Sequence, residues 1–107
     1  MKRTVAVVLC LLFVAAFAAA QETPNLFKTK CAACHGADGT ADTPMGKKQN
    51  IKSFKAPEVQ KMTDADLSAM IATGGPNKLA THQYGSKGLT PDQIKALVAY
   101  VKELGKK

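Results

Sequence analysis

The chain has 107 residues, of which 46% are hydrophobic and 21% charged, and its formal net charge at pH 7 is +7. This length fits a single domain and excludes repeat arrays and αβ barrels, and the apolar content excludes a disordered chain. Residues 21–107 contain only four aromatic side chains, Phe27, Phe54, Tyr84 and Tyr100. Because so small a domain buries little surface, we expect something besides side chains to fill part of its core.

The first 20 residues are typical of a cleaved secretory signal peptide. Basic Lys2 and Arg3 precede an uncharged apolar run over residues 5–20, which ends in three alanines before polar Gln21. An uncleaved membrane anchor is the alternative, since the run approaches the ~17-residue minimum for a span. We therefore predict a signal peptide over residues 1–20, a single domain over residues 21–107, and export to a bacterial periplasm.

The charge of residues 21–107 comes from lysine alone. This part of the chain has 13 Lys and no Arg against 8 Asp and Glu, and no basic run exceeds two residues. Dispersed lysines on an exported chain argue against nucleic-acid binding. Two interpretations remain open, a solvated surface or a ring that docks acidic partner proteins, and the ring would include Lys28, Lys47, Lys78 and Lys87.

The first expected helix, residues 25–34, leads into the segment Cys31-Ala32-Ala33-Cys34-His35. A redox disulfide would require a βαβ pattern around the two cysteines, and a zinc site a second pair of ligands, whereas only His82 remains. Cys-x-x-Cys-His is the spacing of covalent haem attachment. Two thiols on one helical turn, Cys31 and Cys34, add to the two vinyl groups, and the adjacent His35 then lies under the iron.

This segment and its surroundings resemble the class I monohaem cytochromes c over residues 24–104. Phe27 precedes the motif on a short helix, Gly36 follows it, and Pro44 comes nine residues after His35. The resemblance implies an all-α, small cytochrome c fold of three to four helices around one covalently bound haem c. It also implies that the Pro44 carbonyl accepts a hydrogen bond from the His35 imidazole, which would fix the ring.

Two further helices follow in the chain. Thr63-Asp64-Ala65-Asp66 resembles a capping box, and Gly74-Gly75-Pro76 ends the helix that it opens. Thr90-Pro91-Asp92-Gln93 opens the last helix, which we expect to end at Gly105. Its apolar positions recur with helical period at Ile94, Leu97, Val98, Val101 and Leu104.

The aromatic side chains divide between two expected roles. The resemblance implies that the first and last helices cross, with Phe27 and Tyr100 packed at the crossing. Phe54 lines the haem or pins its own loop, and we favour the loop.

The sequence departs from the family at the second axial ligand of the iron. Members usually place a Met about seven residues before the Leu-Thr that opens the last helix, whereas here seven residues before Leu89 is His82. We therefore predict that His35 and His82 ligate the iron as a bis-His pair.

Two alternatives to the bis-His pair remain open. His82 is a solvated loop residue and the iron is five-coordinate, or a Met is the ligand. Met62 and Met70 fit a core better than the iron, and Met45 follows Pro44 too closely to reach around the haem.

These residues indicate an electron carrier and not an enzyme, because no acid–base pair for peroxide cleavage is recognisable. Imidazole favours ferric iron more than a thioether does, so we expect a low reduction potential. We also expect a monomer whose redox partner proteins have acidic docking surfaces. Contact with a membrane is expected only through a larger redox complex. A haem-based sensor or gas-binding protein with a labile sixth ligand is the alternative.

Overall fold

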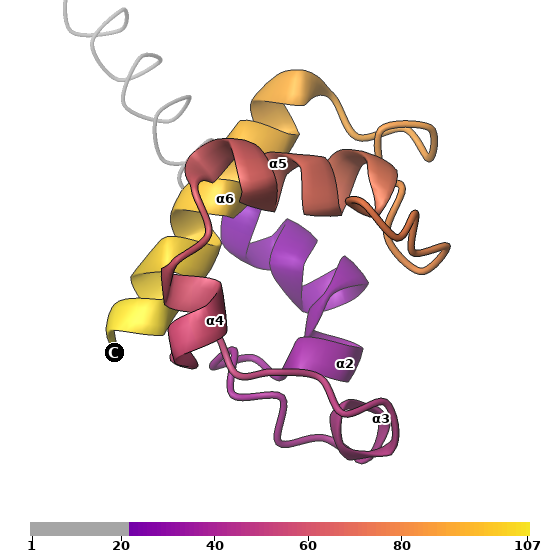
Figure 1. Ribbon diagram of the computed structural model, residues 1–107. Coiled ribbons are helices and arrows are strands. Elements are labelled where there is room, and N and C mark those ends of the chain that lie inside the picture. Colours follow the sequence, from indigo (N-terminus) through magenta and orange to yellow (C-terminus); the bar gives the residue numbers. More distant parts are fainter. Residues whose placement is uncertain (1–21) are drawn as a thin grey trace, which may run out of the picture.

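The last helix, α6 (Pro91–Lys106), supplies half of the buried core in the computed structural model, which describes residues 22–107 (Figure 1). Its start is the predicted capping box: the Thr90 hydroxyl accepts from the Gln93 amide, and the Gln93 side chain accepts from the Thr90 amide at 2.8 Å. Its buried residues are the five of the predicted stripe, Ile94, Leu97, Val98, Val101 and Leu104. The predicted signal peptide lies outside the described residues.

The predicted end of α6 at Gly105 is wrong, because the helix continues to Lys106. Gly105 instead permits a close contact between α6 and the segment that contains Phe54 and Gln60. A Cβ at this position would lie 3.0 Å from the carbonyl oxygen of Phe54 and 2.7 Å from the side-chain nitrogen of Gln60. That nitrogen donates to the Phe54 carbonyl at 2.7 Å and to the Gly105 carbonyl at 3.4 Å, and the second bond links the segment to the end of α6.

Helix α5 (Asp64–Thr73) packs against α6 and follows its predicted boundaries. The Thr63 hydroxyl and the Asp66 carboxylate form the reciprocal capping box. The helix ends at Gly74, whose φ of 85° is the left-handed conformation that glycine adopts without strain.

The predicted helix over residues 25–34 is interrupted. Residues 22–30 are helical, Cys31 forms a turn, and a short helix α2 (Ala32–His35) follows. The segment 22–30 crosses α6 as the resemblance implied: the rings of Phe27 and Tyr100 lie 5.2 Å apart between centroids, and Phe27 is 2% exposed.

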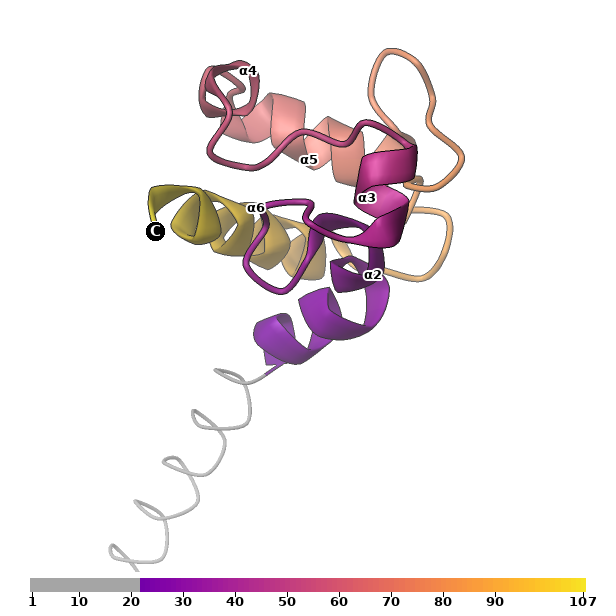
Figure 2. The same cartoon turned by 90° about the horizontal axis from the view of Figure 1, so that it is seen from below.

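Two more short helices, α3 (Pro44–Lys48) and α4 (Pro57–Gln60), complete the described chain. Figure 1 shows α2 and α3 lying together at the lower end of the molecule, and Figure 2 shows the same two helices from below, nearer to the viewer than α5. Residues 22–107 contain helices and turns without a strand, so the all-α prediction is confirmed. No helix within these residues is long and apolar enough to cross a lipid bilayer.

The contact between α2 and α3 predicts a stability effect at Gly46, which is buried in α3. A Cβ there would collide with the Ala41 carbonyl oxygen and lie 2.8 Å from that of Cys34. Helix propensity alone favours Ala over Gly by about 1 kcal/mol. We expect the collision to prevail, so that Gly46→Ala lowers the free energy of unfolding by about 2 kcal/mol in denaturant titration.

Lys48→Ala is the matched control, because Lys48 is exposed on the same helix. Its effect should stay within about 0.5 kcal/mol. A Gly46→Ala variant as stable as the parent would contradict the packing of α2 on α3.

Candidate functional site

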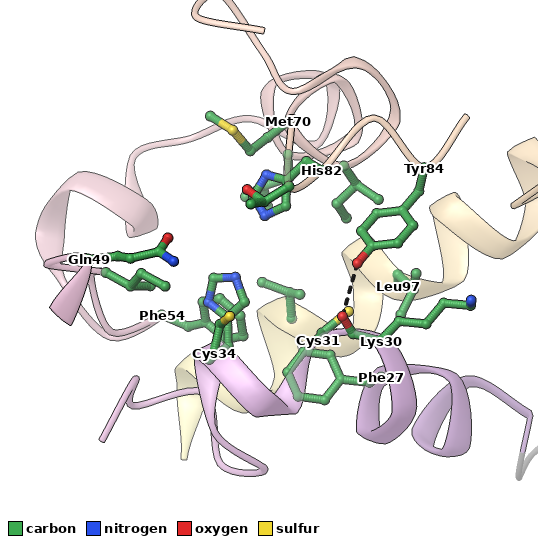
Figure 3. Close-up of a pocket in the computed structure, with 16 residues that line it drawn as sticks. Phe27, Lys30, Cys31, Cys34, Gln49, Phe54, Met70, His82, Tyr84 and Leu97 are labelled. Carbon is green, nitrogen blue, oxygen red and sulfur yellow. Dashed lines mark hydrogen bonds between the residues drawn. The ribbon is translucent and has the colours of Figure 1, made fainter. Parts of the chain in front are cut away.

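A cavity opens between the helical segment 22–30, α2, α5, α6 and the loop that follows α5 (Figure 3). It encloses about 830 Å³ of empty space, counting the part that is open to solvent. Seven of the residues that line it are Phe, Ile, Leu or Val: Phe27, Ile51, Phe54, Leu67, Ile71, Leu97 and Val101. Four of the five predicted site residues also line it: Cys31, Cys34, His35 and His82.

Cys31 and Cys34 lie on one side of the cavity, at the turn and within α2. Both are half-buried free thiols. Burial raises the pKa of Cys31 to about 11, an effect that the charge of Lys30 partly offsets. The Cys31 thiol is therefore protonated at neutral pH.

His35 ends α2, and its imidazole packs against the ring of Phe54 at 5.0 Å between centroids. Burial, followed by the proximity of His82, lowers the pKa of His35 to about 4. The ring is therefore neutral at pH 7, which is the form that binds metals.

Phe54 lies at the cavity and also pins its own loop. It lines the cavity beside His35, and it pins its loop because the Phe54 amide donates to the Gly39 carbonyl at 2.9 Å. A Cβ on Gly39 would collide with the Phe54 ring, so the glycine permits this contact. The expected loop contact is therefore confirmed, and a haem-lining role of Phe54 stays a prediction.

His82 faces His35 across the cavity. The centroids of the two imidazoles lie 6.0 Å apart, and the ring planes differ by 16°. Burial lowers the pKa of His82 as well, although the nearby Met70 carbonyl opposes the shift. The Nδ1 atoms of both rings are buried without a hydrogen-bond partner in the described part of the chain.

The separation of the two imidazoles fits a metal ion held between them. About 2 Å from the metal to each nitrogen, and about 1 Å from nitrogen to ring centroid, give about 6 Å between the centroids. Nowhere in residues 22–107 do three or more His, Cys, Asp or Glu side chains gather in a way that could hold a metal ion.

The hydrogen bond predicted between His35 and the Pro44 carbonyl is absent among the described residues, and the role of Pro44 stays a prediction. Since the Nδ1 atom of His35 has no partner among residues 22–107, the hydrogen bond to the Pro44 carbonyl is not formed.

The three candidate methionines occupy different places. Met70 lines the cavity, and in Figure 3 His82 lies between it and the two cysteines. Met45 is 40% exposed, and its sulfur accepts a hydrogen bond from Gln49. Met62 does not line this cavity. His82 thus lies closer to the cysteine side than the one methionine that lines the cavity.

A family model described as Cytochrome c matches residues 20–105. The chain belongs to the cytochrome c family. Among curated proteins, no sequence matches it. Members of this family bind haem c covalently through Cys-x-x-Cys-His, and Cys31, Cys34 and His35 have that spacing. The apolar cavity, the two thiols and the neutral imidazoles fit such a group.

Thr43 is a supporting residue that the sequence analysis missed. Its hydroxyl donates to the Cys34 carbonyl at 2.7 Å and accepts from the Gly46 amide at 2.8 Å, so one side chain joins α2 to the start of α3. The sequence does contain a local signal, since a Thr before a Pro is typical of a helix N-cap.

Replacing Thr43 distinguishes the contribution of these hydrogen bonds to stability from the contribution of side-chain packing. We expect Thr43→Val to lower the free energy of unfolding of the haem-loaded protein by about 1–2 kcal/mol, because the cap is lost and the Cys34 carbonyl loses its donor. Thr43→Ser keeps the hydroxyl and should retain most of the stability in the same titration. A loss of stability in Thr43→Ser without a comparable loss in Thr43→Val would show that the methyl group, and not the hydroxyl, is what matters.

Proposed function

We propose that this member of the cytochrome c family is a one-haem electron carrier in which His35 and His82 are the two axial ligands. The observation that supports it is the 6.0 Å between the two ring centroids on opposite sides of an apolar cavity. In the proposal, Cys31 and Cys34 hold the haem covalently, and it supplies one-electron redox chemistry when bound.

The residues around the cavity then serve to fix and shield this site. Both imidazoles have lowered pKa values, so each keeps a free nitrogen lone pair at neutral pH. Phe54 holds the face of His35, and Leu97, which is 1% exposed, closes the floor with apolar surface. Two ligands that remain bound in both redox states keep structural rearrangement small during electron transfer.

The identity of the second ligand determines the expected potential. Imidazole is a stronger donor than a thioether and favours ferric iron, whereas a Met ligand raises the reduction potential. A protein with His82 on the iron should therefore operate at lower potential than relatives with a His/Met pair.

The proposed setting is a bacterial periplasm, with acidic redox proteins as partners. The basis is the apolar leader and the excess of lysine. The four lysines named for docking are all exposed, but Lys47 pairs with Asp42 at 3.0 Å and Lys87 bonds to the Ala80 carbonyl. Lys30, which lines the cavity, is placed to attract an acidic partner to its opening.

Replacing the ligand is the direct functional test. We expect His82→Met to raise the midpoint potential of the haem-loaded protein by on the order of 0.1 V, within the about 0.8 V that axial ligands span. Redox titration followed by absorbance measures it. Ala80→Met is the control, because it adds the same thioether to an exposed position of the same loop and should leave the potential unchanged.

An unchanged potential and spectrum in His82→Met would rule out His82 as the ligand. If the parent protein also binds CO rapidly in the ferrous state, the sixth position is open. The sensor or gas-binding function would then replace electron transfer as the better account.

A further inference from the structure

The segment that carries His82 has no regular secondary structure, so its position depends on individual contacts. This segment, residues 79–89, is called the His82 loop below. On one side it is bound to α5: the Tyr84 amide donates to the Ile71 carbonyl at 2.9 Å, and the Gly85 amide to the Ala72 carbonyl at 3.0 Å. Both acceptors lie in the last turn of α5, where carbonyls lack helical partners.

The other side of the cavity also presents a carbonyl without a helical partner. In a continuous helix the Cys34 amide would donate to the Lys30 carbonyl, but here it donates to the Cys31 carbonyl at 3.2 Å. The break in the helix at Cys31 therefore leaves the Lys30 carbonyl available, immediately before the first cysteine of the haem motif.

Tyr84 is the hydrogen-bond donor to this carbonyl. Its hydroxyl donates to the Lys30 carbonyl oxygen at 2.9 Å, across 54 residues of sequence (Figure 3). A tyrosine phenol is protonated at neutral pH and can therefore donate this hydrogen bond. A single side chain, two residues after His82, thus reaches across the cavity to the helix that leads into the cysteines.

Lys87 supports Tyr84 from within the loop. Its ammonium nitrogen lies 5.3 Å from the centroid of the Tyr84 ring, within the range of a cation–π contact. The same nitrogen donates to the Ala80 carbonyl at 2.8 Å, which links the two ends of the segment that contains His82.

We propose that Tyr84 is a positioning residue that holds His82 at the cavity by fastening the His82 loop to the Lys30 carbonyl. When this hydrogen bond is absent, the loop opens more often, and an added ligand competes with His82 more successfully. The proposal extends the proposed function, on which its ligand-competition test rests. Its hydrogen-exchange test does not depend on ligation.

The first test compares Tyr84→Phe with the parent protein, both haem-loaded, by amide hydrogen exchange. One neutral hydrogen bond corresponds to about fivefold in the opening equilibrium. We expect protection of the Gly85 amide to fall by about fivefold, while protection of Val98 in α6 does not change. Unchanged protection at Gly85, or an equal loss at Val98, would overturn the proposal.

The control is Tyr100→Phe. It removes a hydroxyl from the other tyrosine, which packs on Phe27 and makes no hydrogen bond through that hydroxyl within residues 22–107. Protection at Gly85 should be the same in this control as in the parent. A similar loss in both variants would assign the effect to general loosening and overturn the proposal.

The second test adds free imidazole to the ferric proteins and follows its binding by absorbance. We expect the apparent affinity to rise about fivefold in Tyr84→Phe and not in Tyr100→Phe. If the parent is six-coordinate and the affinity is unchanged, Tyr84 does not position His82 and the proposal is overturned. A five-coordinate parent would contradict the proposed function instead, and the exchange at Gly85 would still decide whether Tyr84 fastens the loop.

Discussion

Two neutral imidazoles facing each other across an apolar cavity are the constraint on which the rest of this small protein depends. Their rings come from distant parts of the chain, His35 from the end of α2 and His82 from a loop after α5. Neither element holds its position by itself, because α2 has four residues and the loop has no regular structure. The two sides are therefore fixed by contacts with other segments. Thr43 joins α2 to α3, and the loop is held by its amide hydrogen bonds to α5 and by Tyr84, which joins it to the residue before Cys31.

The shortage of aromatic residues has a structural explanation in the same cavity. Three of the four aromatic side chains in residues 21–107, Phe27, Phe54 and Tyr84, line it, and Tyr100 packs on Phe27 from outside. The apolar stripe of α6 closes the opposite wall through Leu97 and Val101. The core is thus arranged around a space that side chains do not fill, and a flat apolar group bonded to the two cysteines would complete it.

Features encoded within a few residues were predictable from the sequence, and features that depend on distant contacts were not. Both capping boxes, the stripe of α6 and the glycine that ends α5 follow from local spacing. Gly105 was misread because its reason is the distant Phe54 carbonyl, and the break at Cys31 was hidden inside a helical pattern. The hydrogen bond from Tyr84 to Lys30 spans 54 residues and leaves no local signal, whereas Cys31, Cys34 and His35 form one contiguous motif.

The central claim is that His82 occupies the second axial position, and the electron paramagnetic resonance spectrum of the purified ferric protein tests it most directly. Two imidazole ligands predict the signal of a six-coordinate, low-spin iron. The optical absorption spectrum of the same sample should lack the long-wavelength band of a methionine sulfur bound to iron. A low-spin signal accompanied by that band would assign the position to a methionine, of which Met70 lines the cavity. A high-spin signal would show an open position and contradict the account.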